Sequence, residues 1–393
     1  MTASGGLPAP DAEAARLSVQ LETVVRNAIR AAGGVIGFDQ YMDAVLYTPG
    51  LGYYVAGARK FGPGGDFVTA PELTPLFSQC LAQQVAEVLR QSGDTVLELG
   101  AGSGAMAADL LAELARLDCL PRRYSILEPS PELRARQRQT LETRTPRLLQ
   151  RVTWLSALPA EPTDGVILAN EVLDAMPVRR FRVTESGAAR PVGVCWREQG
   201  FVWQLMPPDP DLTHAVHAIQ NRLSVSLPQG YESEFNPALE PWVRSVSDTL
   251  GQGLVLLIDY GYPRAEYYHA QRRAGTVMCH YRQRAHGDPL IYPGIQDVSA
   301  SVDFTAVADA ALASGLDLLG YTTQAWFLLN TGLDGRLAVD ASDDPFSQVQ
   351  RARHAQTLIM PGEMGERFKV MAFGRGLTGP LCGFAAQDQR HRL

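Results

Sequence analysis

The segment Glu98-Leu99-Gly100-Ala101-Gly102-Ser103-Gly104 carries the clearest chemical signal in this chain. It includes the end of a short apolar run at residues 96–99 and precedes a helical pattern. Glycine adopts positive φ readily and lets a ligand approach the backbone where a Cβ would clash. We therefore expect a sharp strand-to-helix turn in which Gly100, Gly102 and Gly104 form a cradle for a bound molecule.

Two classes of ligand fit this spacing, and a turn that uses glycine only for packing is a third interpretation. Gly100-x-Gly102-x-x-Ala105 satisfies a relaxed dinucleotide fingerprint, whose helix N-terminus holds a pyrophosphate. Gly100-x-Gly102-x-Gly104 fits the loop that holds S-adenosylmethionine (SAM). Glu98 favours SAM, because a carboxylate repels a phosphate and attracts a sulfonium and an ammonium group.

Glu128 closes the second expected strand, 24 residues after Gly104. At that position an acidic side chain can accept hydrogen bonds from both hydroxyls of a ribose. SAM sites and nicotinamide sites share this feature, so Glu128 supports nucleoside binding without choosing between them. In the alternative interpretation, Glu128 is exposed to solvent and caps the helix that follows Pro129.

Asn170-Glu171-x-x-Asp174 follows the fourth expected strand at its carboxyl end, where ligands bind in open α/β sheets. Glu171 and Asp174 are three residues apart and would share one face of a helical turn. An arginine acceptor, which the family resemblance given below implies, would suit these carboxylates, because its guanidinium stays protonated and pairs with them in a fork geometry. We expect Glu171, with or without Asp174, to orient the acceptor, and Asn170 to line the cofactor or acceptor side. Alternatively, Asp174 caps the segment before Pro177 and Glu171 pairs with an arginine.

An α/β sheet is the architecture that would position these residues. Five apolar runs are near-continuous rather than alternating, which is typical of parallel strands covered on both faces. Helical patterns between most of them predict right-handed crossovers. The runs are residues 96–99, 125–127, 152–155, 165–168 and 254–258, and late strands are expected at 317–320 and 368–373. Thr69-Ala70-Pro71-Glu72 has the spacing of a capping box and begins a helix expected to run to Leu89.

Composition is that of an ordinary globular protein. The 393 residues are 46% hydrophobic and 20% charged, with a formal net charge of −7, which suits one elaborated domain or two. No local run of positive charge stands out, so we expect no nucleic-acid partner. No apolar stretch reaches the roughly 20 residues of a membrane helix, so we expect no membrane insertion.

The cysteines and the N-terminus bear on the compartment. The five cysteines are far apart and include no C-x-x-C pair, so we expect neither a disulfide framework nor a metal site. The first residues lack the basic and apolar regions of a secretory signal. These features together predict a cytoplasmic protein.

Several separated blocks resemble the MidA family of SAM-dependent methyltransferases, over about Asp39 to Arg375. The glycine loop alone is common to many methyltransferases, whereas the blocks together are specific to this family. They are Leu46-Tyr47-Thr48-Pro49, Gly52-Tyr53-Tyr54, Gly65-Asp66-Phe67-Val68-Thr69-Ala70-Pro71-Glu72, Glu98-Leu99-Gly100-Ala101-Gly102-Ser103-Gly104, Asn170-Glu171-Val172-Leu173-Asp174-Ala175-Met176-Pro177, Ile258-Asp259-Tyr260-Gly261, residues 297–304 and Pro361-Gly362-Glu363-Met364-Gly365.

The resemblance implies an α/β fold with a seven-stranded class I SAM-dependent methyltransferase (Rossmann-like) sheet, an N-terminal helical extension and an inserted α+β subdomain. We expect the extension over residues 1–75, the core over 76–178 and 241–376, the insertion over 179–240 and a C-terminal tail over 377–393. The extension is expected to cover the cofactor through Asp66 and Thr69. The alternative for these two residues is an Asx-type turn followed by a helix cap.

The family includes a mitochondrial arginine methyltransferase that assists the assembly of respiratory complex I. The resemblance therefore implies methylation of arginine on a protein substrate, with a complex I subunit as the candidate. Three alternatives stay open from the residues alone: small-molecule methylation, a SAM-binding assembly chaperone without catalysis, and an NAD-dependent oxidoreductase. The sequence leaves the oligomeric state undetermined.

Overall fold

The chain divides into two compact units in a computed structural model that describes residues 6–55, 68–198, 200–337 and 344–393. The first unit consists of Met1–Phe67, Leu173–Leu239 and Tyr262–Asp303, and the second of Val68–Val172, Glu240–Gly261 and Phe304–Leu393. Residues 262–303, which the sequence places in the methyltransferase core, thus cluster with the N-terminal and inserted segments. Each unit is described separately below.

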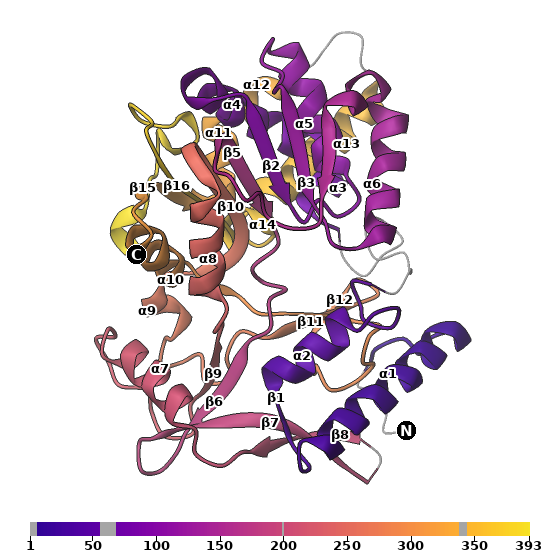
Figure 1. The fold of residues 1–393 in the computed structure, drawn as a ribbon, viewed down its shortest axis with the longest axis vertical. Helices are drawn as coiled ribbons and strands as arrows, with labels where there is room; N and C mark the ends of the chain where they lie inside the picture. Colours follow the sequence, from indigo (N-terminus) through magenta and orange to yellow (C-terminus); the bar gives the residue numbers. More distant parts are fainter. Residues whose placement is uncertain (1–5, 56–67, 199, 338–343) are drawn as a thin grey trace. The chain divides into compact units, whose positions relative to one another are not determined.

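The second unit contains the predicted α/β sheet (Figure 1). Its main strands are β2 (Thr95–Leu99), β3 (Arg123–Leu127), β4 (Val152–Leu155), β5 (Thr163–Asn170), β10 (Leu250–Tyr262), β15 (Asp317–Thr323) and β16 (Phe368–Arg375). Among the described residues they lie in the order β15-β16-β10-β5-β2-β3-β4. The strands from β10 to β4 in this order pair in parallel, and β16 is antiparallel to β10 and β15. This order of seven strands confirms the predicted fold class.

Helices of the second unit pack on this sheet around one apolar core. Leu81, Leu110, Tyr124 and Leu168 are among its fully or almost fully buried members. The helices are α3 (Ala70–Leu73), α4 (Pro75–Ser92), α5 (Ala105–Arg116), α6 (Pro131–Arg144), α8 (Leu239–Asp248), α10 (Phe304–Ala313), α11 (Gln324–Asn330), α12 (Leu333–Arg336), α13 (Pro345–Ile359) and α14 (Met364–Arg367), with the 3-10 turns η1 (Pro146–Arg151), η2 (Cys382–Phe384) and η3 (Arg390–Arg392).

Local sequence explains where the helices near the glycine loop begin. Ser130 caps α6 by accepting a hydrogen bond from the Leu133 amide at 3.3 Å, and a proline follows it at the first helical position. The helix predicted to start at Thr69 is instead two helices, α3 and α4. Thr69 makes no side-chain capping bond to α3. The longer helix α4 is capped separately by Thr74, whose hydroxyl accepts from the Leu76 amide at 3.4 Å.

The first unit combines helices with two small sheets. One sheet runs β1-β7-β6-β9 with β8 paired to β7, and the other runs β12-β11-β13. The bounds are α1 (Ala12–Ala31), β1 (Ile36–Gly37), α2 (Phe38–Tyr47), β6 (Arg179–Val183), β7 (Ala189–Arg197), β8 (Gly200–Leu205), α7 (Pro210–Gln220), β9 (Glu232–Phe235), α9 (Arg264–Tyr267), β11 (Met278–Tyr281), β12 (Arg284–His286), β13 (Asp297–Ser299) and β14 (Val302–Asp303). Within the described ranges of both units, no helix is long and apolar enough to span a membrane.

Candidate cofactor and acceptor site

The glycine loop joins β2 to α5 in a backbone conformation that glycine favours. Gly100, Gly102 and Gly104 have φ angles of 66°, 53° and 84°, all in the left-handed region that L side chains rarely adopt. The Gly104 amide donates to the Ala101 carbonyl at 2.8 Å, which closes the turn, and the Gly100 amide donates to the Leu127 carbonyl at 3.1 Å. The spacing of the glycines is therefore required by the path of the backbone.

The three glycines face different surroundings. A Cβ added at Gly104 would lie 3.0 Å from the Cα of Gln137, and one added at Gly100 would lie 3.2 Å from Cγ2 of Val172. A Cβ added at Gly102 would meet no atom within 4 Å. Gly104 thus serves the close packing of α6, whereas the space beside Gly102 is open for a ligand. This open cradle fits the SAM interpretation.

Glu98 lies at the end of β2 and is buried, with 1% of its surface exposed. Burial raises the pKa of its carboxyl to about 7. A hydrogen bond from the Tyr124 hydroxyl to Oε2 at 2.6 Å lowers this pKa, and the nearby Glu128 carboxylate raises it. The described residues place no cationic side chain among these partners. A buried carboxyl without a cation beside it is the arrangement that a positively charged ligand would stabilise.

Glu128 follows β3 and is also buried, with 4% of its surface exposed. Its Oε1 accepts a hydrogen bond from the Ser130 amide at 2.9 Å, and its Oε2 accepts one from Gln137 Nε2 at 3.0 Å. The alternative of a solvent-exposed capping residue is therefore wrong. Each carboxylate oxygen can accept a second hydrogen bond, so contact with a ribose stays a prediction.

Gln137 is a component of the site that the sequence does not reveal. Its Nε2 also donates to the Gly102 carbonyl at 3.1 Å, and its Oε1 accepts from Trp154 Nε1 at 2.9 Å. This fully buried amide thereby ties the glycine loop to Glu128 and to β4. Its neighbours on α6 are mostly polar, and no pattern in a single sequence distinguishes it from them.

A second contact with the loop comes from α3. Ser103 donates a hydrogen bond to the Glu72 carboxylate, so the segment that begins at Thr69 lies against the loop. Thr69 itself occupies the capping position of α3, and its contact with a cofactor stays a prediction. Asp66, the other residue predicted here, lies outside the described residues.

Glu171 follows β5 with a backbone that is unusual for its residue type. Its φ is 54°, and its amide donates to the Ile258 carbonyl of β10 at 2.8 Å. The Asn170 amide donates to Glu171 Oε1 at 3.1 Å, while Asn170 Oδ1 is buried without a hydrogen-bond partner among the described residues. A left-handed non-glycine residue costs about 1–2 kcal/mol and often marks a functional site.

Asp174 belongs to the first unit and is 5% exposed. Residues 171–174 are not helical, so the expectation that Glu171 and Asp174 share one face of a helical turn is wrong. The left-handed backbone at Glu171 is incompatible with a helix starting there. The Asp174 carbonyl accepts from the Ala300 amide at 3.0 Å. Burial, followed by the charges of Asp174 and Asp297, raises the pKa of Tyr47, whose hydroxyl donates to the Ala175 carbonyl at 2.8 Å.

Comparison with known proteins agrees with this geometry. A family model described as "Putative S-adenosyl-L-methionine-dependent methyltransferase" matches residues 80–322. The rat protein named "Protein arginine methyltransferase NDUFAF7, mitochondrial" is 31% identical, over 86% of this chain and 81% of its own length. The zebrafish protein of the same name is 29% identical, over 87% and 84%.

Solved structures give the same result. The crystal structure of a Burkholderia thailandensis protein bound to S-adenosyl-homocysteine is 47% identical, with a TM-score of 0.92, and the match covers 98% of this chain and 100% of that one. A native structure of a protein from that organism is 46% identical, with a TM-score of 0.90. The bound ligand of the first structure is the demethylated product of SAM.

These comparisons also correct one expectation. The predicted cytoplasmic location is wrong by this criterion, because the curated relatives are mitochondrial proteins by name. Composition and the first residues of the chain carried too little information about compartment to support that prediction. The match over residues 80–322, the relative at 31% identity and the structure bound to S-adenosyl-homocysteine agree on the family and on its cofactor. The chain therefore belongs to the MidA-like family of SAM-dependent methyltransferases, with SAM as its cofactor.

Proposed function

We propose that this methyltransferase modifies an arginine side chain of a protein substrate. The relatives of about 30% identity that span most of the chain are named protein arginine methyltransferases. The observation that carries the proposal is the carboxylate of Glu171, placed by a left-handed backbone at the carboxyl end of β5. Val172, the next residue, lies against Gly100 of the glycine loop.

The residues around the loop divide the task of holding the cofactor. The open backbone at Gly102 provides space for it, Glu98 offers negative charge, and Glu128 is the candidate for the ribose. When bound, SAM supplies a methyl group on a positively charged sulfur, and so carries its own leaving group. The chain then has to align an acceptor and exclude water, which can contribute about 7–11 kcal/mol in favourable cases.

A guanidinium needs orientation, because it stays protonated in the accessible pH range. A carboxylate that accepts two N–H groups in a fork holds the positive charge at the paired nitrogens and leaves the third nitrogen to face the methyl group. In our proposal Glu171 has this role, and the Asn170 amide fixes its Oε1. Asp174, three residues later in the sequence, belongs to the first unit, and its role toward the acceptor stays a prediction.

The substitution Glu171→Gln tests the acceptor role. It keeps the shape of the side chain and removes the charge, so we expect SAM affinity within about twofold of wild type and turnover on protein substrate at least about 100-fold lower. Calorimetry with SAM and transfer of radiolabelled methyl groups measure the two quantities. Glu142→Gln, at an exposed position of α6, is the matched control. Unchanged turnover in Glu171→Gln would contradict the proposal.

The chemical class of the acceptor is tested separately. Mass spectrometry of the proteome, with and without this protein, is expected to show methyl groups gained on arginine. The family resemblance makes a subunit of respiratory complex I the candidate substrate, so purified complex I is the first sample to compare. Methyl incorporation confined to small molecules would overturn the assignment of a protein substrate.

A further inference from the structure

β4 is the last strand of the second unit's sheet. It pairs in parallel with β3 through Val152 to Leu155, and the strand order of the described residues places no strand on its other side. The outer edge of such a strand presents N–H and C=O groups that an extended polypeptide can pair with. The side chains of an added strand would alternate between the two faces of the sheet.

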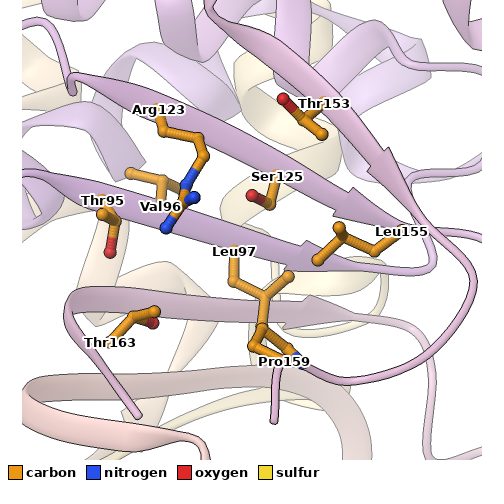
Figure 2. A pocket seen from close by; sticks show the side chains of 9 residues that line it. All are labelled: Thr95, Val96, Leu97, Arg123, Ser125, Thr153, Leu155, Pro159 and Thr163. Atoms are coloured by element: carbon orange, nitrogen blue, oxygen red, sulfur yellow. The ribbon is translucent and has the colours of Figure 1, made fainter. Parts of the chain in front are cut away.

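One face of the sheet has a hollow that extends from β4 over β3 and β2, as Figure 2 shows. The hollow has a volume of about 120 Å³, and its lining includes Leu97, Ser125, Thr153, Leu155 and Pro159. Arg123, an exposed residue of β3, also lines it. The hollow therefore combines an apolar floor with one positive charge.

The opposite face carries a second hollow at the same strand. Its volume is about 430 Å³, and Arg134, Arg138, Val152, Thr153 and Trp154 line it. The Arg138 guanidinium lies 4.5 Å from the centroid of the Trp154 ring, a cation–π arrangement that leaves its N–H groups available. Thr153 lines both hollows, so the two flank a single position of the edge strand.

The charge around β4 is opposite to that of the whole chain. Residues 122–151 contain eight arginines and three glutamates, in a protein with a net charge of −7. Seven of these arginines lie on α6, β3 and η1, and Arg122 precedes β3. Two of the eight, Arg122 and Arg144, pair with Asp94 and Asp109. Within the described part of the chain, neither Arg123 nor Arg138 has a carboxylate partner. A positive patch of this kind is complementary to an acidic partner.

We infer that the outer edge of β4 docks an extended acidic segment of a partner protein, which adds to the sheet as a strand. Acidic side chains of that segment would lie beside Arg123 on one face and beside Arg138 on the other. A polypeptide is favoured over a nucleic acid because the edge offers main-chain hydrogen bonds, which only another polypeptide backbone matches. This inference does not depend on the chemistry of the acceptor.

The test measures binding of a short fluorescein-labelled peptide of Glu-Glu-Val repeats to the full chain. Arg123→Glu and Arg138→Glu are each expected to raise its Kd about tenfold or more. Arg147→Glu, an exposed arginine of η1 that lines neither hollow, is the matched control and should change Kd less than about twofold. Unchanged SAM affinity shows that each variant is folded.

Two further measurements separate strand addition from plain charge attraction. A peptide of equal charge in which proline replaces valine lacks the main-chain N–H donors of the valines. It should bind about tenfold more weakly if the peptide adds to the sheet as a strand. Hydrogen exchange at residues 152–155 should slow when the first peptide is bound. The inference is overturned if the two peptides bind equally, if exchange in β4 is unchanged, or if a single-stranded oligonucleotide of matched charge binds as tightly with the same dependence on Arg123 and Arg138.

Discussion

Replacing Glu98 by glutamine should stabilise the ligand-free protein at neutral pH and weaken its affinity for SAM. The pKa of the Glu98 carboxyl is about 7 in the folded chain, above its ordinary value of 4.5, chiefly because the side chain is buried. The folded protein therefore holds this proton more tightly than the unfolded chain does. As pH rises from about 4.5 to 7, the unfolded chain loses the proton first, and the free energy of unfolding falls.

The size of this effect follows from the shift. A pKa raised from 4.5 to about 7 lowers the free energy of unfolding by about 3 kcal/mol in total, at 1.36 kcal/mol per pH unit. This decrease in stability is complete above pH 7. Glutamine cannot ionise, and its amide oxygen can still accept the hydrogen bond from Tyr124. We thus expect Glu98→Gln to exceed wild type in stability by about 3 kcal/mol at pH 8 and by almost nothing at pH 4.

Urea unfolding of both proteins from pH 4 to 8, without ligand, measures this difference. Calorimetry at pH 8 should show SAM affinity at least about tenfold lower in Glu98→Gln, since the ionised carboxylate favours a cation. Wild-type affinity should also fall as pH drops below 7. Glu132→Gln, an exposed residue of α6, should change neither quantity. Parallel stability curves for wild type and Glu98→Gln, or equal SAM affinities, would refute the reasoning.

Three other substitutions test the scaffold. Gln137→Leu removes three hydrogen bonds of a buried amide beside the loop. It should lower the free energy of unfolding by about 3–5 kcal/mol in urea titrations, whereas exposed Gln139→Leu should cost less than about 0.5 kcal/mol. Gly102→Val places a β-branched residue at a φ of 53° and fills the open space beside it. Circular dichroism should show a folded protein that calorimetry finds unable to bind SAM; retained affinity would place the ligand elsewhere. Arg264→Met removes an ion-pair partner, at 3.1 Å, of Asp303, whose side chain is 10% exposed. It should cost about 3 kcal/mol, against less than about 1 kcal/mol for Arg244→Met at an exposed pair. Equal losses in the two variants would contradict that reasoning.

The sheet was predictable because its strands are buried on both faces. β2 is buried at every position, so its residues form a near-continuous apolar run, interrupted by Glu98 and followed by glycine. The same applies to most of β5 and β10. The helix expected from Thr69 was less predictable, since the T-x-x-E spacing matched a capping box while Glu72 is bonded to Ser103 instead. Two competing partners for one carboxylate cannot be ranked without tertiary structure.

The site was predictable only where the backbone conformation strongly favours one residue type, as positive φ favours glycine. The glycine spacing predicted a loop with left-handed backbone, and the structure has this loop at Gly100, Gly102 and Gly104. Glu171 was identified as a carboxylate after a strand, yet its left-handed backbone depends on a hydrogen bond to Ile258 of β10, 87 residues away in the sequence. Gln137 was missed because its role arises from three contacts that converge only in the folded chain.

The buried Glu98 carboxyl links stability to function in this fold. An apolar residue at the end of β2 would avoid the destabilisation of about 3 kcal/mol at neutral pH, so the charge has no rationale in packing. Its value lies in the bound state, because a cation beside the ionised form offsets the desolvation that the empty site leaves uncompensated. A neutral or anionic ligand would not offset this desolvation. The same carboxyl should therefore make the protein least stable without ligand in the pH range in which it binds SAM best.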